Sequence, residues 1–117
     1  MATNSQIAFN PQGKTVVVAA AAVAPAGVQA PVNIKFNEQE TGQVRIVNAG
    51  TNLVHLGVGP TAAAAQANAV AAAAGVPAAG IPLVAGAVEI LRFPFGSYFS
   101  GLAAGATTVY VTPGEGI

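Results

Sequence analysis

The chain has 117 residues, of which 53% are hydrophobic and only 7% charged, and its four basic and four acidic residues give a formal net charge of zero. This length indicates one domain, residues 1–117. The absence of cysteine excludes disulfides and thiolate metal sites. The four bases are scattered, which argues against nucleic-acid binding because that function needs a basic patch. A surface so poor in charge favours a protein that packs against neighbours.

The first third of the chain predicts an arm and two strands. We interpret residues 1–12 as a terminal arm or short edge strand that ends in a turn. The β-branched run at residues 15–23 predicts a strand buried on both faces. Residues 14–30 also resemble a secretory leader, but the long polar stretch before them favours the strand. Residues 32–36 alternate apolar and polar side chains, as in a half-buried strand, and residues 38–42 form the next turn.

The alternation on both sides of a polar turn predicts a β-hairpin over residues 43–59. Val44 and Ile46 are predicted to point inward, with Arg45 facing outward. A polar turn follows, and an alternating apolar strand returns to pair with the first. This pairing places His55 on the opposite, polar face.

Residues 60–80 form an Ala-rich excursion between two strands, which we interpret as a loop or short helix. Thr61 is a suitable N-cap for a helix over residues 62–74, and Gly75 suits the position just beyond its end. A helix this short without a large apolar stripe must lean on the body or on another chain. The wider uncharged stretch contains prolines and is mostly alanine, which makes it a poor transmembrane helix, and no membrane partner is expected.

The last third predicts four strands, at residues 81–84, 88–93, 98–103 and 107–112. A turn over residues 93–97 joins the second to the third, and Gly105 marks a hairpin turn between the third and fourth. In the last strand, Val109 and Val111 are predicted to face inward and Tyr110 outward. Residues 86–114 are expected to supply about half of the core, because they hold most of the aromatic residues. These aromatic residues are Phe93, Phe95, Tyr98, Phe99 and Tyr110.

Seven or eight short strands with regularly spaced turn signals predict an all-β fold. We expect an antiparallel β-sandwich or jelly roll with one Ala-rich loop or short helix. The only competing signal is Gly57-Val58-Gly59-Pro60-Thr61-Ala62, which matches a G-x-G-x-x-A dinucleotide fingerprint. We reject that reading because no acidic residue follows at the required spacing, and because Pro60 removes an amide beside the phosphate position.

Residues suited to catalysis or metal binding are few, and we expect no catalytic, cofactor or metal site. His55 is the only histidine, so a metal site would require several copies to meet in a symmetric oligomer. It is also the only available base for the serine hydroxyls, and no nucleophile motif surrounds them. The glutamates of the predicted turn are expected to be solvated rather than a glycosidase pair. These serines and glutamates are Ser5, Ser97, Ser100, Glu38 and Glu40.

The few charged residues serve either solubility or ion pairs with a partner. They include Lys14, Lys35, Glu40, Arg45, Glu89 and Arg92. Phe93 and Phe95 flank Pro94 and are interpreted as core or rim residues, with interface anchoring as the alternative.

Three segments resemble small structural proteins of tailed bacteriophage virions, over roughly residues 43–116. They are AGAVEILRFPFG at residues 85–96, TTVYVTPGEG at residues 107–116, and VRIVNAG at residues 44–50 with the Ala-rich loop after it. The resemblance implies a non-enzymatic capsid decoration, or cement, protein that binds the major capsid protein on the outside of the phage head. It would be made in the host cytoplasm.

Within that implied function, homodimers or trimers at local symmetry axes and strand addition at an exposed sheet edge are available modes of assembly. The alternatives are a tail- or fibre-associated host-binding module and a secreted adhesin-like β domain.

Overall fold

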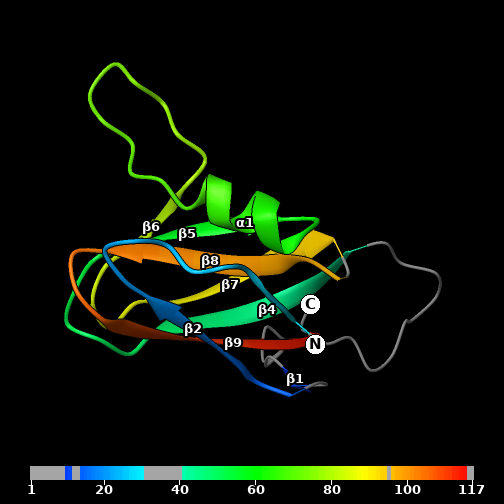
Figure 1. Cartoon of the computed structure of the whole chain (residues 1–117). Coiled ribbons are helices and arrows are strands. Elements are labelled where there is room, and N and C mark those ends of the chain that lie inside the picture. Colours follow the sequence, from blue (N-terminus) through cyan, green and yellow to red (C-terminus); the bar gives the residue numbers. More distant parts are fainter. Residues whose placement is uncertain (1–9, 12–13, 31–40, 95, 116–117) are drawn as a thin grey trace.

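The computed structural model describes residues 10–11, 14–30, 41–94 and 96–115. Within them, two antiparallel sheets pack face to face, and one short helix lies on the outer side of one sheet (Figure 1). Sheet A contains β1 (Asn10–Pro11), β2 (Val16–Ala20), β4 (Thr41–Asn48), β7 (Val88–Pro94) and β9 (Thr107–Glu115). Sheet B contains β3 (Val28–Gln29), β5 (Val54–Gly59), β6 (Ile81–Leu83) and β8 (Tyr98–Ala103). The predicted all-β sandwich of antiparallel sheets is confirmed.

Successive strands mostly alternate between the sheets. Sheet A has the order β2-β9-β4-β7, with β1 continuing along the same side of β9 as β2, and sheet B has the order β3-β8-β5-β6. From β2 to β5 and from β6 to β9, each strand is followed by one in the other sheet. Only β5 and β6 are both consecutive and paired with each other.

The predicted hairpin over residues 43–59 is therefore wrong in its pairing, although both of its strands exist. β4 pairs with β7 and β9, whereas β5 pairs with β6 and β8. The turn at Gly105 likewise joins β8 in sheet B to β9 in sheet A. Val44, Ile46, Val54 and Leu56 are buried as predicted, but they face one another across the sandwich. The alternation of apolar and polar residues identifies the side of a strand that faces the core. That side is the same whether the chain turns back within one sheet or crosses to the other sheet.

The core is built mainly from aliphatic side chains rather than aromatic ones. Phe99 is fully buried and meets the half-buried Phe93 edge to face, with ring centroids 5.4 Å apart. Tyr110 is 40% exposed and faces outward as predicted, and Phe95 lies outside the described residues. The remaining fully buried large side chains come from both sheets: Val18, Ile46, Val54, Leu56, Leu83, Val109 and Val111.

Strand β2 is buried on one face only, which corrects the prediction for residues 15–23. Val18 and Ala20 are buried, while Val17 between them is 49% exposed. Two turn assignments also change, because Pro11 pairs in β1 and β4 begins at Thr41. Most of the predicted arm over residues 1–12, the predicted strand at 32–36 and the first part of the next turn fall outside the described residues.

The helix α1 spans Ala62–Asn68, which is shorter than predicted. Thr61 is the N-cap, and its Oγ1 accepts a hydrogen bond from the Ala64 backbone N at 3.1 Å, as the sequence indicated. The helix ends where the Asn68 side chain donates to the Val58 carbonyl at 2.7 Å. Because only Ala65 and the capping Ala69 are buried, packing does not extend the helix farther. Gly75 does not cap it and instead lies in a separate tight turn with φ +76°.

Candidate docking surface

The polar residues considered for catalysis have structural roles where they are described. Ser97 Oγ donates to the Pro94 carbonyl at 2.7 Å, and Ser100 Oγ donates to the Pro25 carbonyl at 2.6 Å. Among the described residues, no group of three or more His, Cys, Asp or Glu side chains could hold a metal ion. Four of the earlier candidates lie outside the described residues: Ser5, Lys35, Glu38 and Glu40.

His55 lies on the outer side of sheet B and is half-buried rather than solvated. Its ring lines a shallow pocket with Leu53 and Leu102. Its Nδ1 atom is buried and has no hydrogen-bond partner among the described residues. A buried polar atom without a hydrogen bond lowers the free energy of unfolding, so the surroundings of His55 do not stabilise its imidazole ring.

We expect His55→Leu to leave the free energy of unfolding unchanged or raise it by up to about 1 kcal/mol, because it removes an unpaired buried nitrogen. The matched control is Asn68→Leu, which removes a side-chain hydrogen bond to Val58 and should be destabilising. Urea denaturation followed by circular dichroism measures both. Equal destabilisation by the two changes would contradict this interpretation of His55.

The glycines of the G-x-G motif have a packing role. A Cβ atom on Gly57 would lie 2.7 Å from Ala69 Cα, and one on Gly59 would lie 2.7 Å from Ala64 Cβ. Both glycines therefore let α1 lie directly on β5. Gly27 adds a backbone hydrogen bond to the Ala62 carbonyl at 3.1 Å. The outer face of sheet B is thus covered by α1 and the segment before β3.

The outer face of sheet A, by contrast, carries a continuous row of apolar side chains. Val17 on β2 is opposite Tyr110 on β9, Tyr110 is opposite Val47 on β4, and Val47 is opposite Val88 on β7. We call these four residues the outer-face row. Val17, Tyr110 and Val88 are 40–50% exposed, and Val47 is half-buried. Directly opposed residues on a sheet lie side by side, so the row crosses the whole width of sheet A.

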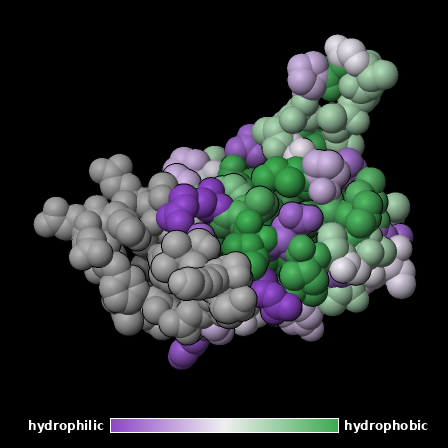
Figure 2. Space-filling model, turned by 180° about the vertical axis from the view of Figure 1, so that it is seen from behind, coloured by the Kyte–Doolittle hydropathy of each residue, from purple (hydrophilic) through white to green (hydrophobic). Residues whose placement is uncertain are grey.

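The row continues around the free edge of β7. Figure 2 shows the side of the molecule where β6 and β7 are the edge strands, and hydrophobic side chains gather over it. Ile90 on β7 is 47% exposed, and Val84, the residue after β6, is 64% exposed. β7 is seven residues long and, among the described strands, pairs on one side only, whereas β6 has three residues and includes Pro82. Long apolar edges of this kind are templates for another strand.

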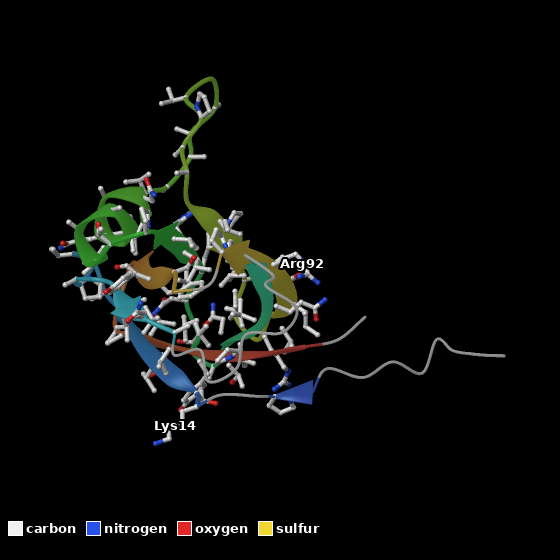
Figure 3. The ribbon with its side chains drawn as sticks, turned by 90° about the vertical axis from the view of Figure 1, so that its right-hand side faces the viewer. Lys14 and Arg92 are labelled. Carbon is white, nitrogen blue, oxygen red and sulfur yellow. The ribbon has the colours of Figure 1, made fainter. Side chains whose placement is uncertain are left out.

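Basic residues border this surface. Arg45 is exposed and lies two positions from Val47 on the same face of β4, and Arg92 occupies an outer-face position on β7. Lys14 is exposed just before β2. Figure 3 shows Lys14 and Arg92 projecting from different sides of the body. The basic groups are therefore spread across sheet A rather than clustered.

A second apolar feature is the projecting loop, residues 70–80, which stands away from the body beyond α1 (Figure 1). It has no charged residue, and Val76 near its tip is 61% exposed. Ala73 and Val76 exchange two backbone hydrogen bonds of 3.1 and 2.9 Å, which hold the tip as a tight turn. At its base, Gly80 passes so close to the Val70 carbonyl that a side chain there would collide with it.

No family model, curated protein or solved structure matches the chain. Among the described residues, no helix is long and apolar enough to cross a membrane. The strongest surface feature is thus the outer-face row with the β7 edge, which was not predicted from the sequence. The only signal of this surface in the sequence is that apolar residues occupy both faces of two strands. For the strand predicted at residues 15–23, this pattern was interpreted as burial of both faces.

Proposed function

We propose that this chain is a non-enzymatic structural protein of a phage virion, a decoration protein that binds the major capsid protein on the outside of the head. The single observation that carries the proposal is the exposed apolar outer-face row of sheet A together with the β7 edge, with which no other described strand pairs beyond β4. Large exposed apolar patches mark interaction sites on soluble proteins. The resemblance of residues 43–116 to small virion proteins supports the same function.

The fold we propose in detail is a jelly roll. The orders β2-β9-β4-β7 and β3-β8-β5-β6, with consecutive strands alternating between sheets, support this assignment. Jelly rolls are common in viral capsid domains, and also in lectins. Because a fold alone does not define a function, the surface and not the topology has to identify the partner.

The mechanism we propose is burial of surface across the joints between shell subunits. The outer-face row would lose its contact with water, and the β7 edge would add main-chain hydrogen bonds to a strand of the shell. Dimers or trimers at local symmetry axes would repeat the contact and strengthen it.

Mass spectrometry of purified particles tests the location. Hundreds of copies per particle are expected for a head decoration protein, whereas a handful would support the alternative of a tail- or fibre-associated module. Absence from the particle would contradict both, and would leave the adhesin-like domain as the competing function.

A double change, Val17→Ser with Val88→Ser, tests the surface. We expect binding to heads that lack the chain to weaken by roughly tenfold to a hundredfold, since each half-exposed valine contributes on the order of 1 kcal/mol when buried. Stability should change little, because both side chains already meet water. The control is Val23→Ser, at a valine that is 81% exposed outside the row. Binding curves from co-sedimentation with the heads measure each variant, and equal binding by the two variants would exclude the row as the contact.

A further inference from the structure

We infer that two copies of this chain associate through the sheet-B side of the molecule, with the projecting loop of each copy seated in the His55 pocket of the other. The His55 pocket is the shallow pocket lined by Leu53, His55 and Leu102. This inference does not rest on the proposed function, because it concerns the side of the sandwich opposite the outer-face row.

Charged residues are absent from the sheet-B side of the described chain. Residues 15–30, 46–88 and 93–114 include the described strands of sheet B, α1 and the projecting loop, and they contain no Asp, Glu, Lys or Arg. The charged residues of the described segments all lie on sheet A or next to it: Lys14, Arg45, Glu89, Arg92 and Glu115. A surface without charge would leave the charges of an acidic or basic partner desolvated and unpaired. We therefore expect the occupant of this side to be as neutral as the side itself.

The projecting loop and the His55 pocket match in chemistry, and neither is covered within its own chain. The loop consists only of Ala, Val, Gly and Pro, and residues 70–77 are all exposed. The pocket has a volume of about 360 Å³, and no residue of the loop lines it. Val76 near the loop tip is 61% exposed, and Leu53 in the pocket is 44% exposed. Contact between the two would remove both side chains from water, which favours association.

The base of the loop is next to the pocket, whereas its tip is not. Gly80 ends the loop beside His55, since a Cβ atom on Gly80 would lie 3.2 Å from His55 Cβ. The tip stands away from the body (Figure 1), so the tip and the pocket of one chain are separated by the length of the loop. A second copy, related by a two-fold axis and facing this side, brings each tip to the base of the other loop. Closed two-fold contacts of this kind are the commonest in homo-oligomers.

The size of these features suits a dimer. The eleven residues of the loop and the seven that line the pocket make eighteen per copy, close to the roughly 20–30 that each partner contributes to a standard interface. Exposed alanines of α1, Ala63 and Ala67, lie on the same side of sheet B and extend the neutral surface. A lipid bilayer suits the loop less well, because the loop lacks the aromatic and basic residues that anchor segments at membrane surfaces.

The first test is the association state of the purified chain, measured by sedimentation velocity over a range of concentrations. We expect a monomer–dimer equilibrium. Val76→Glu and Leu53→Lys should each raise the dissociation constant of the dimer roughly a hundredfold, because an unpaired charge would be buried at both contacts. The control, Val17→Glu, places a charge on sheet A at a valine that is 49% exposed, and should dimerise like the native chain.

The second test mixes the two variants. In a mixed dimer, the carboxylate of Val76→Glu meets the ammonium group of Leu53→Lys at one contact, and the other contact is native. We expect the mixture to dimerise at least about tenfold more tightly than either variant alone. A variant that had failed to fold would not regain association on mixing, so this measurement separates loss of the contact from loss of the fold.

The outcomes are distinct from those for the proposed function. A native chain that stays monomeric at about 1 mM would overturn the dimer, as would single variants that associate like Val17→Glu, or a mixture no tighter than its components. Binding of the native chain, but not of Val76→Glu, to phosphatidylcholine vesicles without any dimer would overturn it in favour of a lipid partner. None of these results bears on binding to heads, and heads that do not bind the native chain would overturn the decoration function while leaving the dimer standing.

Discussion

Gly57→Ala is expected to lower the free energy of unfolding by about 3 kcal/mol, as overpacking against an element that cannot yield easily does. The added methyl would collide with the Ala65 carbonyl and the Ala69 amide and lie 2.7 Å from Ala69 Cα, and all of these are backbone atoms. A side chain could rotate away, but here α1 itself has to move off β5. That shift would expose Ala65, the only fully buried residue within the helix.

Substitutions of two other glycines serve as controls for the loss of stability expected from Gly57→Ala. Gly105→Ala would bring a Cβ no closer than 3.4 Å to the Asn52 side-chain nitrogen, so its effect should stay within about 0.5 kcal/mol. Gly75→Ala meets nothing within 4 Å but has φ +76°, and should cost about 1 kcal/mol through backbone strain alone. Urea denaturation of the three variants gives the order. If Gly57→Ala matched Gly105→Ala, the close contact between α1 and β5 would be refuted.

This result bears on what could be predicted from the sequence. The G-x-G motif was separated from nucleotide binding because no acidic residue follows it at the required spacing, whereas the packing role of its glycines depends on a helix lying on the strand that carries them. Nothing in the sequence shows which strand α1 will cover. The helix start was predictable because Thr61 acts locally, whereas its end was not, because the bond from Asn68 to Val58 joins two separate elements.

Strand positions were predictable for a similar reason, and their partners were not. The strand Tyr98–Ala103 has the predicted bounds, and Val109 and Val111 face inward as their alternation indicated. Pairing depends on whether the chain turns within a sheet or crosses to the other, and both paths bury the same residues. The outer-face row on sheet A was not predicted because an apolar residue on the outer side of a strand gives the same sequence pattern whether another element covers it or water does.

The corner at Asn48 provides the second large effect. The chain crosses from one sheet to the other between β4 and β5 and again between β6 and β7, and we call these two connections the crossings. The Asn48 side chain is fully buried where they meet. Its Nδ2 donates to the carbonyls of Asn52, Leu83 and Val84 at 2.9, 2.9 and 3.1 Å, and its Oδ1 accepts from the Gly50 N at 3.1 Å. One amide therefore satisfies backbone groups from both crossings.

We expect Asn48→Ala to lower the free energy of unfolding by about 3 kcal/mol, because it leaves several partly buried backbone groups without partners. Asn48→Asp, which has nearly the same shape, should be worse at neutral pH, since its carboxylate would face carbonyl oxygens instead of donating to them. The control is Asn52→Ala in the same turn, which removes a single bond of 3.1 Å to Thr107 and should cost about 1 kcal/mol. Urea denaturation ranks the three.

The order Asp, then Ala, then the Asn52 control would show that the amide group, rather than the volume of the side chain, joins the two crossings. Equal losses at both positions would mean that the corner is held by the chain path alone. The same hydrogen bonds favour the observed path over a hairpin, because a short turn that paired β4 with β5 would not bring the Leu83 and Val84 carbonyls to the buried Asn48 amide.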